Sequence, residues 1–277
     1  MTDRWFCASR PRPAAAIRLV CLPYAGGAAS VYRQWEHLAP PHVEVCPVEL
    51  PGRGTRMGET PFRRLPPLIR ALADALEPLL DRPCAFFGHS MGGLVAFELA
   101  RLLRRRGWPE PCHLFVSASP APPRRHEPAM HDAPDAEVKA RLRTLSGTPR
   151  EILEDDELMK LVLPVIRADF SVLETYEYFE EPPLSVPITV FGGLHDRAVR
   201  RADLEGWRAH STDSRLWMLP GDHFFIHDLA PGLVNLVAEH FTQACPEIGP
   251  GVPRDARAGQ HPRLASGWVR VEQESTT

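Results

Sequence analysis

Short apolar runs alternate with amphipathic stretches along the first half of the chain. Four runs have the length and composition of buried strands: residues 17–23, 43–48, 84–87 and 114–117. Three intervening stretches carry apolar residues at helical spacing: residues 30–38, 65–80 and 91–105. Ser30 is the expected N-cap of the first of these helices. The β-α-β-α order predicts an α/β fold with a mostly parallel, doubly wound sheet, helices on both faces and chemical groups at the carboxyl ends of the strands.

The alternation stops between residues 121 and 187, where helical patterns predominate. We expect helices at 136–145 and 156–178, the second interrupted by Pro164. The second stretch holds more apolar residues than a solvated helix would show. We therefore interpret residues 121–187 as an inserted helical cap, which either packs on the main domain or covers an apolar substrate pocket.

The strand and helix pattern resumes after the cap and then fades. Strands are predicted at 188–192 and 215–219, and helices at 202–210 and 231–243. Residues 246–277 are rich in Pro, Gly, Arg and Ser and show little apolar periodicity. The sequence therefore predicts a single domain over residues 1–245 and a disordered tail over residues 246–277, despite Trp268.

The composition is that of a soluble globular protein. Of the 277 residues, 44% are hydrophobic and 24% are charged. The formal net charge of -3 gives no reason to expect nucleic-acid binding. No basic start followed by an apolar stretch indicates a leader, and no apolar run reaches membrane-spanning length, so we expect a cytoplasmic protein.

The cysteines show no C-x-x-C pairing, although there are six of them. Cys21, Cys46, Cys84 and Cys112 lie within or beside predicted strands. Buried free thiols explain such positions more simply than metal ligands or disulfides do. The sequence therefore indicates neither a metal nor a cofactor.

Residues 88–92 form a G-x-S-x-G pattern centred on Ser90. A predicted strand precedes the pattern, and a predicted helix ending in three arginines follows it, which is the context of a sharp strand-to-helix turn. Such a turn strains its central residue and exposes the hydroxyl above the sheet edge, while Gly88 and Gly92 keep the neighbouring chain clear. We therefore predict that Ser90 is a nucleophile rather than a structural turn serine.

A serine nucleophile needs a base that takes its proton and a carboxylate that orients the base. In a sheet of this kind the three residues follow in the order Ser, Asp or Glu, His. Asp196 follows the predicted strand at 188–192, and His223 follows the next strand at 215–219. Because these strand ends share one sheet edge with Ser90, we predict that Ser90, Asp196 and His223 form a catalytic triad.

Several other titratable residues compete for these roles. Asp222 adjoins His223, and consecutive side chains diverge, so we expect Asp222 to cap the chain or to face solvent. His227 lies one helical turn beyond and further from the strand end. Glu49 is an alternative acid, but it precedes Ser90 in the chain, against the usual order. Two further histidines are expected to have structural roles, in a turn and in the core respectively: His195 and His89.

The tetrahedral oxyanion formed during acyl transfer needs two waiting N–H donors. One donor is usually the amide after the nucleophile, here that of Met91. The other comes from the loop after an early strand, and we choose Ala25, because Gly26 and Gly27 let the backbone there face a substrate. The alternative is that the two glycines form only a tight turn.

From about residue 5 to residue 243 the chain resembles the type II thioesterases, stand-alone α/β-hydrolases that accompany polyketide synthases and nonribosomal peptide synthetases. Five segments carry the resemblance: 22–27 (LPYAGG), 51–54 (PGRG), 87–93 (FGHSMGG), 163–170 (LPVIRADF) with Glu174 and Tyr176, and 221–224 (GDHF). The cap segment separates this family from general esterases, because the G-x-S-x-G pattern alone does not. The chain departs from the family at Tyr24, where histidine is common, and residues after Cys245 lie outside the resemblance.

The resemblance implies the same triad of Ser90, Asp196 and His223, and an oxyanion hole formed by the amides of Ala25 and Met91. It also implies hydrolysis of acyl thioesters on the phosphopantetheine arm of acyl- or peptidyl-carrier proteins, which clears wrong or stalled groups from an antibiotic assembly line. Carrier proteins often present acidic helices. A basic pair just before the cap either meets that charge or forms a solvated turn: Arg124 and Arg125.

Two other functions are alternatives to thioester hydrolysis. A carboxylesterase or lipase that acts on free esters needs the same triad. A hydrolase-like binding protein without turnover needs none of it, so the intact residues argue against this class.

Overall fold

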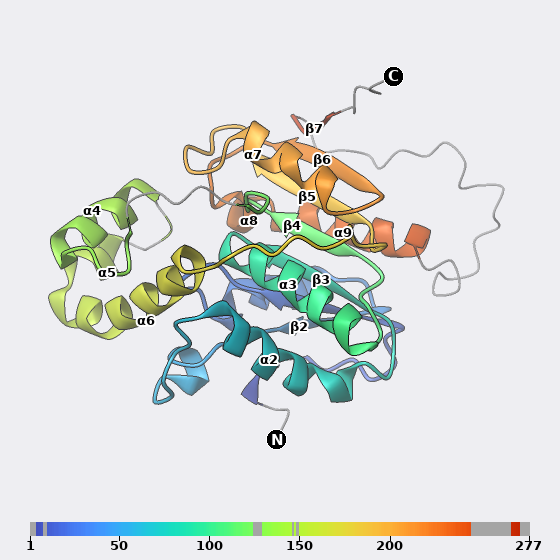
Figure 1. Ribbon diagram of the computed structural model, residues 1–277, viewed down its shortest axis with the longest axis horizontal. Coiled ribbons are helices and arrows are strands. Elements are labelled where there is room, and N and C mark those ends of the chain that lie inside the picture. The colour runs from blue at the N-terminus through green and yellow to red at the C-terminus, as the bar shows by residue number, and fades with distance from the viewer. Residues whose placement is uncertain are drawn as a thin grey trace.

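One sheet runs through the centre of the molecule, and the computed structural model describes residues 4–7, 10–123, 129–145, 147, 150–244 and 267–271. Within these residues the strand order is β2-β1-β3-β4-β5-β6-β7 (Figure 1). The first six strands are parallel, and β7 is antiparallel to β6. The strands are β1 (Ile17–Leu22), β2 (Val43–Pro47), β3 (Cys84–His89), β4 (Leu114–Ser117), β5 (Ile188–Gly193), β6 (Ser214–Leu219) and β7 (Val269–Val271).

The strand order reverses next to β1, and this reversal places the site. The chain passes from β1 outward to β2 and then returns to β3 on the other side of β1. In the β1 and β3 pairing Leu22 lies opposite Gly88, so the turn after β1 lies beside the turn after β3. In open parallel sheets such a reversal leaves a crevice at the carboxyl ends of the strands.

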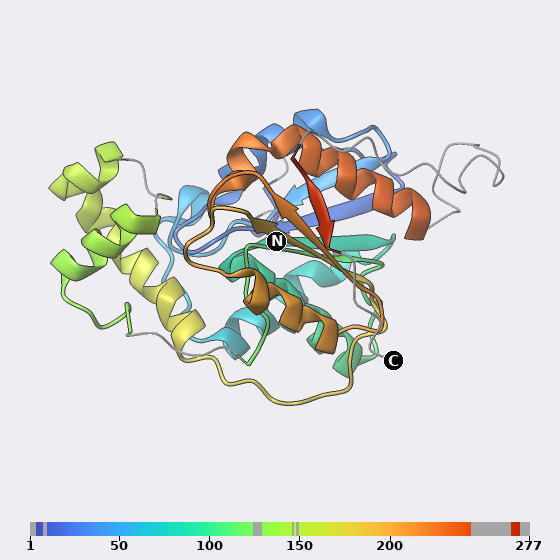
Figure 2. The same ribbon diagram turned by 90° about the horizontal axis from the view of Figure 1, so that it is seen from above.

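Helices cover both faces of the sheet and form two cores (Figure 2). On one face α2 (Leu65–Leu76), α3 (Met91–Arg106) and α7 (Arg201–Glu205) pack on the strands. On the other face lie α1 (Arg33–Leu38), α8 (Phe225–Asp228) and α9 (Ala230–Ala244). Because both faces are covered, the central strands are buried throughout, which explains their continuous apolar runs. The predicted α/β fold with a mostly parallel sheet is confirmed.

The cap consists of α4 (Asp135–Leu145), α5 (Arg150–Glu154) and α6 (Asp156–Glu174). Figure 1 shows α4 and α5 set to one side of the sheet, with α6 leading from them to the main domain. The cap has a small core of its own, formed by Met130, Val138, Leu142, Leu153, Met159, Leu163 and Ile166. Leu158 and Leu161 are exposed on the face of α6 that points away from this core.

Pro164 does not interrupt the cap helix, contrary to the sequence prediction. α6 is continuous over Asp156–Glu174, and it ends four residues before the predicted boundary. Pro164 lies on the exposed side, whereas its neighbours Leu163 and Val165 are buried. A proline removes one helical hydrogen bond, and the residue four positions earlier that loses this bond, Lys160, is exposed. Packing on either side of Pro164 therefore holds the helix together.

The predicted serine cap of the first helix is also wrong. Ser30 lies inside a 3-10 turn over Ala29–Tyr32, and α1 begins only at Arg33. Tyr32 is buried, and its hydroxyl donates a hydrogen bond to the carbonyl oxygen of Leu22 at 2.7 Å. Tertiary burial of this tyrosine therefore sets the start of the helix in place of the local capping preference. Other 3-10 turns occupy Gly54–Arg56, Glu77–Leu79 and Gly206–Ala209.

The predicted disordered tail differs from the structure at residues 267–271. There β7 adds an antiparallel strand to the edge of the sheet, with Val269 opposite Met218. Trp268 is buried in the core around α9, and its ring packs against Gly232, where a side chain would not fit. The burial of one large aromatic ring explains why this short segment joins the sheet. The remaining tail positions, 246–266 and 272–277, lie outside the described residues.

A buried histidine, His113, lies just before β4 at the amino end of the sheet. Its Nε2 lies 2.9 Å from Thr189 Oγ1, and its ring stacks on Phe115 with the ring centroids 4.2 Å apart. Its Nδ1 is buried and has no hydrogen-bond partner in the described part of the chain. Burial, with smaller contributions from His240 and Arg215, lowers the pKa of His113 to about 3.

We predict that His113 makes the fold sensitive to acid. An imidazole in the unfolded chain has a pKa of ~6.5, so between about pH 6.5 and pH 3 the unfolded state binds a proton that the folded state does not. Protonation then favours unfolding, and this one group should lower the free energy of unfolding by about 2 kcal/mol from pH 7.5 to pH 5. Urea titrations across that range should show that the free energy of unfolding falls less steeply with decreasing pH for His113→Gln than for the wild type. The control His37→Gln, at an exposed histidine, should show the wild-type dependence on pH. The same dependence in all three proteins would contradict the prediction.

Candidate active site

Ser90 lies in the turn between β3 and α3, with φ 53° and ψ −114°. A Cβ at Gly88 would overlap the carbonyl oxygen of Gly92, and a Cβ at Gly92 would overlap that of Leu22. Glycine at both positions therefore lets α3 approach the two strands. The Ser90 N–H donates to the carbonyl oxygen of Ser117 at 2.7 Å, which ties the turn to β4. The turn has the strained backbone that the G-x-S-x-G pattern predicted.

The three residues predicted as a triad meet at the carboxyl edge of the sheet. Ser90 Oγ lies 3.1 Å from His223 Nε2, within hydrogen-bond distance. His223 Nδ1 lies 2.8 Å from Asp196 Oδ2 on the other side of the ring. Ser90 remains partly accessible, whereas His223 is 8% exposed. The arrangement can therefore pass a proton from the hydroxyl to the imidazole while the carboxylate holds the ring.

The carboxylate of Asp196 is held from both sides. Its Oδ1 accepts the backbone N–H groups of Ala198 at 2.7 Å and Val199 at 3.0 Å, which leaves Oδ2 for His223. The side chain is only 1% exposed. Hydrogen bonds from backbone amides stabilise a buried carboxylate and fix its orientation. His223 Nδ1 therefore meets a carboxylate oxygen that is held in one orientation.

The competing residues lie near the triad but have other partners. Asp222 Oδ1 accepts the Phe224 N–H at 2.8 Å, so Asp222 caps the turn as predicted. His227 Nε2 lies 3.2 Å from the Tyr24 hydroxyl. Glu49 is buried against Gly54, and no described contact joins it to the triad. An exposed turn holds one more histidine, as predicted: His195.

His89 contacts His223 through the backbone of His223. Its Nε2 lies 2.9 Å from the His223 carbonyl oxygen, and its Nδ1 lies 2.9 Å from Ser117 Oγ. Because a carbonyl oxygen only accepts, Nε2 carries the proton and Nδ1 accepts from the serine hydroxyl. Burial holds the pKa of His89 well below its ordinary value, so the ring is neutral. The prediction of a buried histidine bonded to backbone is confirmed.

The pairing of β1 with β3 places the turn after β1 beside the turn of Ser90, where the two predicted oxyanion donors are sought. Met91 is the first residue of α3, where an N–H has no acceptor within its own helix. In the turn after β1, the Gly26 N–H donates to Asp169 Oδ2 at 2.7 Å, and the Gly27 N–H donates to the Tyr24 carbonyl oxygen at 2.9 Å. The N–H groups of Gly26 and Gly27 thus have acceptors within the protein, and the Ala25 N–H stays the candidate donor in this turn.

A buried ion pair at the site has no counterpart among the chemical roles predicted from sequence. Asp169 of α6 binds the Arg53 guanidinium through both carboxylate oxygens, at 2.6 and 2.8 Å. One signal was available. Asp169 interrupts the apolar face of α6 that includes Ile166 and Val172, and a buried acid requires a partner.

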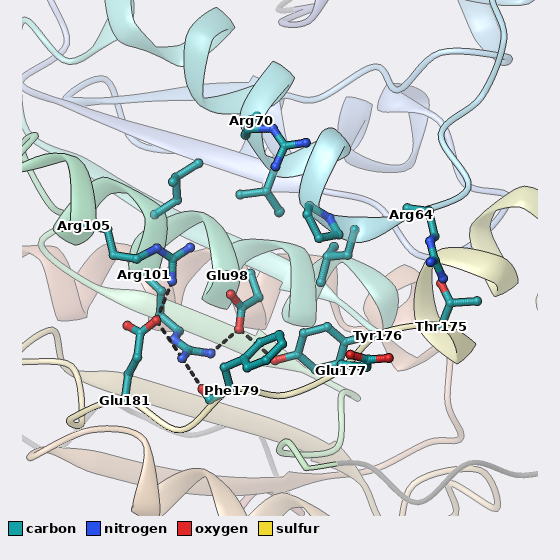
Figure 3. A pocket seen from close by; sticks show the side chains of 14 residues that line it. Arg64, Arg70, Glu98, Arg101, Arg105, Thr175, Tyr176, Glu177, Phe179 and Glu181 are labelled. Atoms are coloured by element: carbon teal, nitrogen blue, oxygen red, sulfur yellow. Dashed lines mark hydrogen bonds and ion pairs between the residues drawn. The ribbon is translucent and has the colours of Figure 1, made fainter.

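A cavity of about 540 Å³ lies elsewhere, between α2, α3 and the segment that follows α6 (Figure 3). The Tyr176 hydroxyl donates to Glu98 at 2.8 Å, and Arg101 binds both Glu98 and Glu181. None of the three triad residues lines the cavity. These contacts tie the end of the cap to α3, the helix that begins at the turn of Ser90.

Arg124 and Arg125 lie outside the described residues. Within the described ranges, no group of His, Cys, Asp or Glu side chains is arranged to hold a metal ion. Nor does any helix in these ranges have the length and apolar character needed to cross a membrane.

Burial raises the pKa of Cys46 and of Cys84 to about 12, so both remain protonated thiols at neutral pH.

Known proteins of one family resemble the chain over most of its length. A family model described as the thioesterase domain matches residues 17–244. The gramicidin S biosynthesis protein GrsT of Aneurinibacillus migulanus is 43% identical over 234 residues, covering 82% of this chain and 89% of GrsT. Thioesterase PikA5 of Streptomyces venezuelae is 35% identical over 272 residues, covering 95% of each chain.

Solved structures show the same relationship. The type II thioesterase BorB from the borrelidin biosynthetic cluster is 36% identical with a TM-score of 0.79, covering 87% of this chain and 98% of BorB. RedJ, a thioesterase from the prodiginine pathway of Streptomyces coelicolor, is 39% identical with a TM-score of 0.78, covering 84% of this chain and 91% of RedJ. The chain therefore belongs to the thioesterase family, has the α/β-hydrolase fold and is a hydrolase of acyl thioesters, as the resemblance to type II thioesterases predicted.

Proposed function

We propose that the protein is an editing thioesterase that removes acyl groups from the phosphopantetheine arm of carrier proteins in a polyketide or nonribosomal peptide assembly line. The relatives support this role, because their names place them in gramicidin S and borrelidin biosynthesis. Ser90 is the nucleophile, His223 the general base and Asp196 the residue that orients the base. The observation that carries this assignment is the hydrogen-bonded chain through the three side chains at the carboxyl edge of the sheet.

The first half of the reaction forms an acyl-enzyme. His223 Nε2 takes the proton of the Ser90 hydroxyl as the oxygen attacks the thioester carbonyl carbon. The carbonyl oxygen becomes an oxyanion, which the N–H groups of Ala25 and Met91 stabilise. The carbon–sulfur bond then breaks, and the pantetheine sulfur leaves and takes the proton from His223. A thiol has a pKa of about 8.5, so this leaving group needs less help from an acid than an amine or alkoxide does.

The second half releases the acid. Water enters where the thiol left, His223 takes its proton, and the hydroxide oxygen attacks the acyl carbon. The second oxyanion uses the same two amides. Collapse breaks the bond to Ser90 Oγ, which recovers its proton from His223. The carboxylate of Asp196 stabilises the imidazolium in both halves.

Substrate preference tests this function directly. One acyl group should be offered as a phosphopantetheinylated carrier thioester, as a small N-acetylcysteamine thioester and as a simple 4-nitrophenyl ester. We expect kcat/KM to be about 10²-fold higher for the carrier thioester than for the simple ester, because contacts remote from the carbonyl contribute to transition-state binding. Ser90→Ala should abolish all three activities. A preference for the simple ester would indicate a carboxylesterase or lipase, and no turnover of any substrate would indicate a binding protein.

A further inference from the structure

The cap helix α6 makes a polar contact with the turn at residues 24–27 through Asp169. This side chain is buried within the main domain, although it belongs to the cap. Its Oδ2 accepts both the Gly26 N–H at 2.7 Å and Arg53 Nη1 at 2.6 Å. Its Oδ1 accepts Arg53 Nη2 at 2.8 Å. One carboxylate of the cap therefore holds the turn and the loop after β2 together.

Arg53 holds the same turn from a second point. Its Nη1 also donates to the carbonyl oxygen of Gly27 at 3.2 Å. Apolar packing adds to these bonds, because Ile166 of α6 lies directly against Gly26, which has φ +78°. A Cβ at Gly26 would come within 3.1 Å of Ile166 Cγ1, so a larger residue would push the helix away. Asp169 and Arg53 thus fix two successive residues of the turn.

These bonds determine the direction of the Ala25 N–H. The peptide between Tyr24 and Ala25 is planar, so its C=O and N–H point in opposite directions. The Tyr24 carbonyl oxygen accepts the Gly27 N–H at 2.9 Å, and this closes the turn. Because Gly26 and Gly27 are held by Asp169 and Arg53, the Tyr24 carbonyl is held too. The Ala25 N–H must then point away from the side of the turn on which the Tyr24 carbonyl oxygen accepts the Gly27 N–H.

We propose that Asp169 is a positioning residue, which orients the Ala25 N–H as an oxyanion donor and completes the oxyanion hole only while α6 is seated on Arg53 and the turn. This rests on the proposed roles of Ser90 and Ala25. The alternative is that the ion pair of Asp169 and Arg53 only stabilises the fold. The two interpretations predict different activities for a variant that is as stable as the wild type but lacks this ion pair. Replacing a buried ion pair with apolar residues of similar size often leaves stability unchanged, whereas removing one partner does not.

The double variant Arg53→Met with Asp169→Leu makes this test. It removes both charges and therefore leaves no buried ion without a partner, but the Gly26 N–H loses its acceptor. Asp169→Asn is the second variant, since it retains an oxygen for Gly26. The matched control is Arg18→Met with Glu44→Leu, which removes another buried pair, between the amino ends of β1 and β2. The other partners of this pair, Asp81 and Arg82, are more exposed than the pair itself. Thermal melts and circular dichroism establish that each variant is folded.

Two readouts separate positioning from stability. The first is kcat and KM for a small thioester, where we expect the double variant to lose about 10²-fold in kcat with KM within a few-fold of wild type. The second is the affinity of hexylboronic acid, whose boron accepts an electron pair from Ser90 Oγ while His223 takes the proton. The tetrahedral anion that results occupies the oxyanion hole, so its affinity should fall by a similar factor. The Arg18 and Glu44 control should match wild type in both readouts.

The inference is overturned if the double variant has a melting temperature near that of the wild type and also has the wild-type kcat and boronate affinity. It is supported if the protein is equally stable but remains slow and binds the boronate weakly, with Asp169→Asn losing less than the double variant. The boronate needs only Ser90 and the oxyanion hole, so it tests Asp169 even if carrier thioesters prove to be poor substrates. A wild-type protein that binds no boronate would overturn the positioning role together with the proposed roles of Ser90 and Ala25.

Discussion

Replacing Ser90 with alanine is expected to lower kcat for thioester hydrolysis by about 10⁵- to 10⁶-fold. The hydroxyl is the group that His223 Nε2 contacts at 3.1 Å, and alanine offers no oxygen in its place. The rate that remains should come from the oxyanion donors and from substrate binding. Single-turnover assays with an acyl thioester measure the loss, and a decrease of less than about 10²-fold would contradict the role of Ser90.

The same position offers a matched control for the backbone. Ser90 has φ 53°, which a residue with a Cβ adopts at a cost of about 1–3 kcal/mol. Ser90→Gly should therefore be as inactive as Ser90→Ala but more stable by about 1 kcal/mol in urea unfolding. Equal stability of the two variants would show that the turn carries little strain. A gain for glycine would show that the exposed nucleophile is obtained at the expense of stability.

The proximity of Ser90, Asp196 and His223 could be predicted from sequence because strand ends in a parallel sheet share one edge. Ser90, Asp196 and His223 each follow a recognisable apolar run, and the sheet then brings residues 133 positions apart within 3.1 Å. The G-x-S-x-G pattern identified the turn itself, because only glycine fits where α3 meets β1 and β3. The sequence was therefore sufficient to predict a backbone conformation where one strong local pattern determines it.

The errors arose where tertiary contacts override local preferences. Packing on both sides of Pro164 keeps α6 continuous, and the buried hydroxyl bond of Tyr32 moves the helix start away from Ser30. Trp268 gives three residues enough burial to form β7, although the surrounding composition is typical of disorder. The contact of Asp169 with Arg53 spans 116 positions, and nothing in a single sequence pairs these two residues.

Asp196→Asn is expected to lower kcat by about 10⁴-fold while leaving the fold intact. The reason lies in the two amides that the carboxylate binds. Oδ1 accepts the N–H groups of Ala198 and Val199, so an asparagine must place its oxygen there and its NH₂ group toward His223. His223 Nδ1 then becomes an acceptor, and the ring carries its proton on Nε2, facing Ser90. An imidazole in that tautomer cannot take the proton of the hydroxyl.

This prediction separates a tautomer effect from a loss of structure. Asparagine has nearly the shape of aspartate, so the melting temperature should change little while kcat falls. Asp222→Asn is the matched control, because Asp222 is adjacent to His223 but only caps the Phe224 N–H and faces solvent. It should retain kcat within about 3-fold, as expected for a surface residue. If Asp222→Asn lost as much activity as Asp196→Asn, the negative charge near His223 would matter more than its direction. The assignment of Asp196 as the orienting carboxylate would then be wrong.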